Sequence, residues 1–267
     1  MITLPERAIN STLLNYTVDY EREKFTGSLT LVATVESFEW LRSQTAHYLS
    51  LQEHALIKRM VSVRRQESFL RGRWAAKTGL LAFLGGEPTA WDIAPGVFGQ
   101  PIVRYLGQDR PPVTLSISHS DSGALALIAP AAWPAAVDCE LVSSKNLQAI
   151  AGQMTKSEIE FSSVQTQVAY VTALTMMWSL KEAASKILGG GLAIDFTMLE
   201  LSDLKFSAQG NMLALFTYFG HLQGIACAKQ SCVTALVFPE SSKIHSEVAP
   251  LMRREIDVLA MGAPQIS

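Results

Sequence analysis

Two acidic residues lie two positions apart in the segment Ala135–Leu141, which reads AAVDCEL. If this segment is a β-strand, Asp138 and Glu140 leave the same face of it. Two carboxylates held that close repel each other unless a cation, a shared proton or an arginine neutralises them. Mg²⁺ is the natural candidate, because it binds few protein carboxylates and completes its shell with water and phosphate oxygens. The alternative is an exposed acidic pair on an edge strand.

A third acidic residue occurs in Met176–Leu192, MMWSLKEAASKILGGGL, which has the composition of an apolar helix that stops at three glycines. Glu182 and Lys186 are four residues apart and therefore share a helix face. They could form an ordinary surface salt bridge, worth about 0.2–0.5 kcal/mol. Alternatively, Glu182 supplies a third carboxylate, and Lys186 supplies a cation for charge that develops on a transferred phosphate.

Two further segments contain possible phosphate donors. His119 lies in the polar segment SISHS between Ser118 and Ser120, although a lone histidine there could be incidental. Between positions 54 and 77 there is one acid, Glu67, and seven basic residues: Lys58, Arg59, Arg64, Arg65, Arg71, Arg73 and Lys77. Such a block could be a solvated face, a nucleic-acid patch or a site for a multiply phosphorylated small molecule.

The elements that must position these residues follow one order twice. After a first stretch of twenty-five residues that we expect to be irregular, the patterns predict a strand, helices and strands, and then the same series again. The expected elements are a strand at 29–35, helices at 35–47 and 51–85, the second long or broken in two, short extended pieces within 91–110, a hairpin at 114–120 and 124–130, a strand at 135–141, helices within 144–188, and strands from 196 onward.

This order predicts an α+β fold built as a pseudo-dimer of two similar halves, although no residue-level repeat is evident. The join lies near Pro130–Pro134, so we expect an N-terminal half at 1–133 and a C-terminal half at 134–267 that carries the metal motifs. The two halves would form one functional unit. The tail after Glu240 contains no motif that we can interpret.

Composition limits the class of protein. The 267 residues are 48% hydrophobic and 17% charged, with a net charge of −2, which favours a compact globule over disorder. The three cysteines, Cys139, Cys227 and Cys232, show neither disulfide nor zinc spacing and favour a reducing compartment. We find no signal peptide and no membrane span, so we expect a cytoplasmic protein with no membrane partner.

Four segments, in order, resemble the motifs of the large, surfactin- and enterobactin-type class of 4′-phosphopantetheinyl transferases. They are FGQPIV (98–103), SISHS (116–120), AVDCE (136–140) and WSLKEAASK (178–186). A further stretch, FLRGRWAAK (69–77), is also similar to that class. Glu182 follows Asp138 by 44 positions, where the family places its second acidic motif. The resemblance covers about Leu29–Phe238.

The resemblance implies a pseudo-dimeric α+β fold with the active site in the cleft between the halves. It implies an enzyme of the holo-carrier-protein synthase type, which uses Mg²⁺ and takes coenzyme A as co-substrate. Such an enzyme transfers 4′-phosphopantetheine to a serine of an apo acyl or peptidyl carrier protein and releases adenosine 3′,5′-bisphosphate. The pathway would be fatty-acid, polyketide or nonribosomal-peptide biosynthesis.

By motif match, the metal ligands are Asp138, Glu140 and Glu182. Glu182 is also the expected general base, and Lys186 would stabilise or protonate the leaving diphosphate oxygen. The resemblance further assigns contacts with coenzyme A to Arg71, Arg73, Lys77, Gly99, Pro101, Ser118, His119, Ser120 and Lys186. Of these, Gly99 and Pro101 would shape the loop near the adenine.

The sequence departs from the family pattern at three places. Ser68 stands where an arginine is frequent, Ala136 where a glycine often precedes the acidic pair, and Cys139 where aliphatic residues are usual. None of these removes a proposed ligand. The alternative function is a non-catalytic relative that binds carrier protein or coenzyme A. We expect a monomer, and no nucleic-acid partner, because the chain is net acidic and lacks a nucleic-acid-binding motif.

Overall fold

The computed structural model describes residues 12–20, 23–34, 36–107, 109, 112–120, 123–244 and 248–261, with side chains described from residue 36 onward except at a few positions. The N-terminal part contains β1 (Thr12–Tyr20), β2 (Glu23–Thr34), α1 (Phe38–Ser43), α2 (Thr45–Tyr48), α3 (Leu51–Lys58), α4 (Val63–Leu84), β3 (Trp91–Pro95), β4 (Pro101–Tyr105), β5 (Val113–Ser120) and β6 (Gly123–Pro130).

The C-terminal part contains β7 (Ala136–Leu141), α5 (Leu147–Ala151), α6 (Lys156–Val164), α7 (Tyr170–Ile187), β8 (Leu201–Phe206), β9 (Met212–Phe216), β10 (Leu222–Lys229), β11 (Cys232–Pro239), β12 (Ser242–Ile244) and α8 (Val248–Met261). One sheet has the strand order β12-β1-β2-β6-β5 and a second has the order β7-β11-β10-β9-β8, while β3 and β4 form a separate hairpin. All the paired strands are antiparallel, so the fold is α+β as expected.

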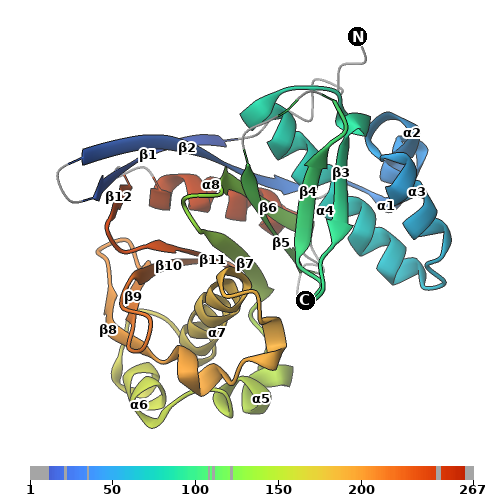
Figure 1. The fold of residues 1–267 in the computed structure, drawn as a ribbon. Coiled ribbons are helices and arrows are strands. Elements are labelled where there is room, and N and C mark those ends of the chain that lie inside the picture. The colour runs from blue at the N-terminus through green and yellow to red at the C-terminus, as the bar shows by residue number, and fades with distance from the viewer. Residues whose placement is uncertain are drawn as a thin grey trace.

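One long helix covers each sheet. Helix α4 packs on β2, β5 and β6, and α7 packs on β7, β10 and β11 (Figure 1). Helix α7 is suited to this position because its central turns are almost wholly apolar and buried. Gly85 caps α4, while Leu188 caps α7 and is followed by Gly189, which adopts a φ of 71° that other residues rarely take. Among the described residues, no helix is both long and apolar enough to cross a membrane.

The two parts of the chain use the same buried ion pair. In the first, Glu53 closes a capping box at the start of α3 and its carboxylate pairs with Lys77 of α4 at 2.9 Å. In the second, Glu158 closes a capping box at the start of α6 and pairs with Lys181 of α7 at 2.7 Å. In each case the other oxygen of the glutamate accepts a backbone hydrogen bond from the first strand that follows the helix of the lysine.

The corresponding lysines reveal a short repeat that the sequence analysis missed. Lys77 ends the segment W-A-A-K (74–77), and Lys181 ends W-S-L-K (178–181). Both lysine side chains are fully buried and complete their hydrogen bonding with backbone carbonyls. The shared spacing of tryptophan and lysine is therefore the feature of the sequence that could have revealed this repeat. Glu182 directly follows the second copy.

The structure confirms most of the predicted elements and corrects others. The helical pattern at 51–85 is broken into α3 and α4, the 114–130 hairpin is β5–β6, and β3–β4 supply the short extended pieces. The expectation of an irregular first twenty-five residues is wrong for β1 and for the start of β2. The tail after Glu240 contains β12 and α8, whose apolar face could have been detected.

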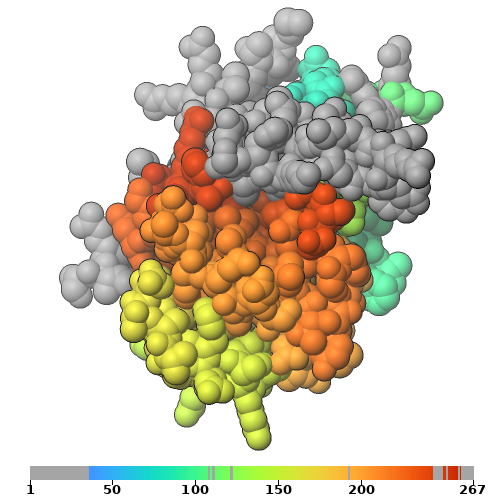
Figure 2. Space-filling view, turned by 90° about the vertical axis from the view of Figure 1, so that its left-hand side faces the viewer, coloured from blue at the N-terminus to red at the C-terminus, as the bar shows by residue number. Residues whose placement is uncertain are grey.

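The end of the chain returns to the N-terminal part. The predicted boundary at 133 and 134 lies in the connection between β6 and β7, yet β12 pairs with β1, and α8 packs on both β2 and β10. Met252, Ile256 and Leu259 of α8 are buried in a core shared with β6, β7, β10 and β11. In Figure 2, the residues from α6 through β11, coloured yellow to orange, form a continuous lower surface on the face shown.

Candidate active site

Asp138 lies at the junction of the two parts and is 3% exposed. Its Oδ1 accepts a hydrogen bond from the Ser118 hydroxyl of β5 at 2.7 Å. The same oxygen accepts from Lys186 Nζ of α7 at 2.7 Å, and that ammonium also donates to the Val137 carbonyl at 2.9 Å. Three elements from both parts of the chain therefore converge on one carboxylate oxygen.

The other oxygen of Asp138, Oδ2, is buried and has no hydrogen-bond partner among the described residues. A buried carboxylate oxygen without a partner is costly, because burial removes its water and nothing replaces it. Lys186 supplies a positive charge at Oδ1, whereas no partner is present at Oδ2. A cation at Oδ2 would therefore supply the missing partner.

Glu140 and Glu182 carry the electrostatic consequence of the same crowding. Burial and the Asp138 and Glu182 carboxylates raise the pKa of Glu140 to about 7, while a hydrogen bond from Trp178 and the charge of Lys186 offset part of this. Burial and the Asp138 carboxylate likewise raise the pKa of Glu182 to about 7, against the effect of Lys186. The Asp138 carboxylate therefore lies close enough to oppose the ionisation of both glutamates.

The carboxylates are not gathered into a ready-made metal site. Within the part of the chain that the structure describes, no three His, Cys, Asp or Glu side chains form such a group. The acids nevertheless fit a hard cation in their chemistry: all donors are carboxylate oxygens, one of them is unpartnered, and two have raised pKa values that a bound cation would reverse.

Ser118 does not fit the predicted phosphate contact. It is 6% exposed, its hydroxyl donates to Asp138, and its oxygen accepts from the Cys139 amide at 3.1 Å. The hydroxyl has a single hydrogen, and Asp138 takes it. The expectation that Ser118 donates to a phosphate is therefore wrong for this structure. Side chains alternate between the two faces of β5, and Ser116 and Ser118 therefore both point toward β7.

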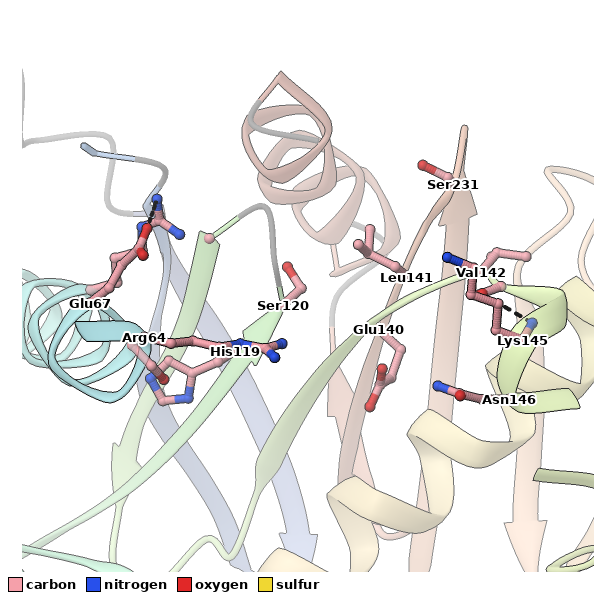
Figure 3. Close-up of a pocket in the computed structure, with 14 residues that line it drawn as sticks. Arg64, Glu67, His119, Ser120, Glu140, Leu141, Val142, Lys145, Asn146 and Ser231 are labelled. Atoms are coloured by element: carbon pink, nitrogen blue, oxygen red, sulfur yellow. Dashed lines mark hydrogen bonds and ion pairs between the residues drawn. The ribbon is translucent and has the colours of Figure 1, made fainter. Parts of the chain in front are cut away.

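A cavity of about 590 Å³ opens beside Glu140. In Figure 3, Arg64, Glu67, His119 and Ser120 form one wall, and Glu140, Lys145 and Asn146 belong to the opposite wall. The first wall comes from α4 and β5, and the second comes from β7 and the 3₁₀ turn Ser144–Asn146. Cationic side chains on both walls suit a ligand with more than one negative charge.

His119, Ser120 and Arg71, three of the expected coenzyme A contacts, line this cavity. Arg71 is held by an ion pair with Glu67 at 2.8 Å and by the Glu36 carbonyl at 3.2 Å. The His119 ring rests on Gly72 of α4, where a side chain would collide with it. Desolvation of the ring and the positive charges of Lys186 and Arg73 lower the pKa of His119 to about 4, although the residue as a whole remains exposed.

Arg73 and Lys77 do not reach this cavity, and the prediction that they bind phosphates is wrong. Lys77 is fully buried, where its ammonium contacts Glu53 and the carbonyls of Pro88 and Trp91. Arg73 pairs with the same glutamate at 2.9 Å and donates to the Ile93 carbonyl. Glu53 is fully buried, and the buried carboxylate of Asp92 lies near the same two cations, so two acids and two bases balance one another.

Gly99 and Pro101 line a second cavity, of about 500 Å³, together with Phe98, Ile102, Ala136 and Ile187. This cavity is mostly apolar, and Lys186 and Ser116 are among its polar lining residues. The predicted coenzyme A contacts thus fall on two sides of the Lys186–Asp138 pair. The structure adds Lys145, Asn146 and Trp178 to the residues near the site, which no spacing rule would have selected.

Comparison with known proteins adds a family assignment for part of the chain. The family model of the 4′-phosphopantetheinyl transferase superfamily matches residues 134–230. A search of curated proteins found no match. Among solved structures, a holo-(acyl-carrier-protein) synthase from Bacillus anthracis str. Ames in complex with CoA (3′,5′-ADP) is 20% identical, with a TM-score of 0.33, and covers 44% of this chain and 96% of that chain.

A TM-score of 0.33 at 20% identity is too low to establish a relationship, so the resemblance to the superfamily depends on the family model alone. The matched segment contains Asp138, Glu140, Glu182 and Lys186. The resemblance to the 4′-phosphopantetheinyl transferase superfamily that the sequence motifs indicate is thereby confirmed over residues 134–230.

Proposed function

We propose that this protein transfers 4′-phosphopantetheine from coenzyme A to a serine of an apo acyl or peptidyl carrier protein, in a Mg²⁺-dependent reaction that releases adenosine 3′,5′-bisphosphate. The observation that carries the proposal is the buried Asp138, held by Lys186 on one oxygen, unpartnered on the other, and adjacent to two acids of raised pKa. The family match over residues 134–230 supports it.

The cavity beside Glu140 is the proposed site for the nucleotide end of coenzyme A. Its volume of about 590 Å³ lies within the usual range of small-molecule sites, and Arg64, Arg71 and Lys145 line it. These cations would neutralise phosphates, and His119 and Ser120 would add hydrogen bonds. Coenzyme A carries its phosphates close to its adenosine, which matches a site with cations on opposite walls.

Asp138, Glu140 and Glu182 would hold the Mg²⁺ ion. Bound there, it would neutralise charge on the coenzyme A diphosphate. The residue that keeps Asp138 in place before binding is Lys186, whose ammonium supplies the positive charge on the Oδ1 side.

Glu182 and Lys186 would carry the proton chemistry. The carrier serine oxygen attacks the β-phosphorus, so that a new P–O bond forms while the bond to the departing adenosine 3′,5′-bisphosphate breaks. Glu182 would accept the serine proton as the general base. Lys186 stabilises the negative charge on the leaving oxygen, or donates a proton to it.

We also propose that the two parts, 1–133 and 134–267, form a pseudo-dimer with the active site in the cleft between them. Support comes from the matching Lys–Glu pairs, and from the contribution of β5, β7 and α7 to one site. A monomer in the cytoplasm fits this proposal, since a single chain supplies every site residue, and its three cysteines are buried and free.

Mass spectrometry of a panel of apo carrier proteins tests the proposal. After incubation with coenzyme A, Mg²⁺ and the protein, at least one carrier should gain the mass of one phosphopantetheine. Omitting Mg²⁺, or replacing the carrier serine by alanine, should prevent the gain. If fatty-acid, polyketide and peptide-synthetase carriers all remain unmodified while the protein still binds coenzyme A, the non-catalytic alternative is favoured instead.

A further inference from the structure

We propose that Ser118 is a positioning residue for Asp138: together with Lys186 it occupies Oδ1 and leaves Oδ2 for the metal ion. This inference rests on the proposed function. Ser118 Oγ and Lys186 Nζ each lie 2.7 Å from Oδ1. Oδ2 is buried without a partner among the described residues. The carboxylate therefore presents one saturated oxygen and one oxygen that is able to accept a ligand.

The direction of the Ser118 hydrogen bond is fixed by its surroundings. The Cys139 amide donates to Ser118 Oγ at 3.1 Å, so the hydroxyl acts as acceptor toward the backbone and as donor toward Asp138. The side chain is 6% exposed and has little room for another rotamer. It therefore holds both the backbone of β7 and the carboxylate that β7 carries.

This bond also joins the two parts of the chain. Ser118 belongs to β5 and Asp138 to β7, and these strands lie in different sheets. The orientation of Asp138 consequently depends on how the N-terminal sheet docks against the C-terminal sheet. Residues that orient metal ligands in this way typically change metal affinity or activity by about 10–100-fold when they are removed.

Ser116 provides a matched control on the same strand. It is also 6% exposed, accepts from the Val137 amide at 3.1 Å and approaches the Val137 carbonyl at 3.4 Å. It binds only the backbone of β7 and contacts no carboxylate in these bonds. The pair Ser118→Ala and Ser116→Ala therefore separates the orientation of Asp138 from the docking of β5 on β7.

The test titrates MgCl₂ alone into the full chain by calorimetry, and then measures carrier modification at saturating Mg²⁺. We expect Ser118→Ala to weaken Mg²⁺ binding by about tenfold or more, and to lower kcat while the KM for coenzyme A changes less than twofold. Ser118→Thr, which keeps the hydroxyl, should recover most of both. Ser116→Ala should stay within about twofold of wild type in Mg²⁺ affinity.

Several results would overturn the inference. Equal Mg²⁺ affinity in Ser118→Ala and wild type would do so, as would an equal loss in Ser116→Ala. A raised KM for coenzyme A with unchanged Mg²⁺ binding would make Ser118 a phosphate contact instead. If Ser118→Ala does not fold, Ser118→Cys, a weaker donor of similar size, replaces it. Wild-type protein that neither binds Mg²⁺ nor modifies any carrier would refute the proposed function itself.

Discussion

At the scale of single residues, two buried ion pairs differ in whether all their charged atoms have hydrogen-bond partners, and this difference defines the site. In the pair of Lys77 and Glu53 every charged atom has partners, so the pair can do nothing except hold elements together. In the pair of Lys186 and Asp138, one carboxylate oxygen is left over, and two further acids lie close by. A buried group that lacks a partner and lies beside acids of raised pKa is the pattern expected of a functional site.

The first prediction concerns Asp138 itself. Asp138→Asn removes the charge while keeping the size, so Mg²⁺ should no longer bind measurably by calorimetry, and carrier modification should fall by at least about 100-fold. Circular dichroism should show a folded protein, because the amide oxygen can still accept from Ser118 and Lys186. The control is Asp203→Asn at an exposed surface pair, which should leave activity unchanged. Normal turnover in Asp138→Asn would remove this residue from the metal site.

At the scale of elements, local patterns predict which face a residue occupies but not what lies opposite. The alternation in β7 and the four-residue spacing in α7 were sufficient to select Asp138, Glu140, Glu182 and Lys186. The basic block before residue 77 was misleading in part, because its composition does not show that Lys77 and Arg73 face Glu53, which belongs to another helix. Pairing of distant buried charges is a tertiary property and has no local signature.

A comparison of two residues of α4 tests whether Lys77 is structural while Arg71 binds coenzyme A. Arg71→Ala, at the cavity, should raise the KM for coenzyme A several-fold and lower the melting temperature only slightly, since its ion pair with Glu67 is partly exposed. Lys77→Met should instead lower the free energy of unfolding by about 3 kcal/mol, because it leaves the buried carboxylates of Glu53 and Asp92 with only Arg73 to neutralise them. The KM of the folded Lys77→Met protein should stay near the wild-type value, and an increase as large as that in Arg71→Ala would contradict the structural role.

At the scale of the whole molecule, the two hairpins β5–β6 and β10–β11 can be superposed on their last strand pairs, so that the pair Ser120–Gly123 corresponds to the pair Lys229–Cys232. In this register Cys227 corresponds to Ser118. Through the pairing of β2 with β6 and of β7 with β11, Val32 corresponds to Asp138. The pseudo-symmetric counterpart of the Ser118–Asp138 site, formed by Cys227 and Val32, therefore has neither the acid nor the hydroxyl. Helix α8 packs on β10 and β2, the two strands that contain these residues.

This asymmetry predicts one site per chain and a purely structural role for α8. Calorimetry should show about one Mg²⁺ and one coenzyme A bound per chain. Ile256, fully buried on α8, packs in the core shared by both parts, so Ile256→Ala should lower the free energy of unfolding by about 2–5 kcal/mol. Below its lowered melting temperature the variant should retain wild-type kcat and KM. Loss of kcat in folded Ile256→Ala would mean that α8 takes part in the site, because the defect could no longer be ascribed to the core that it completes.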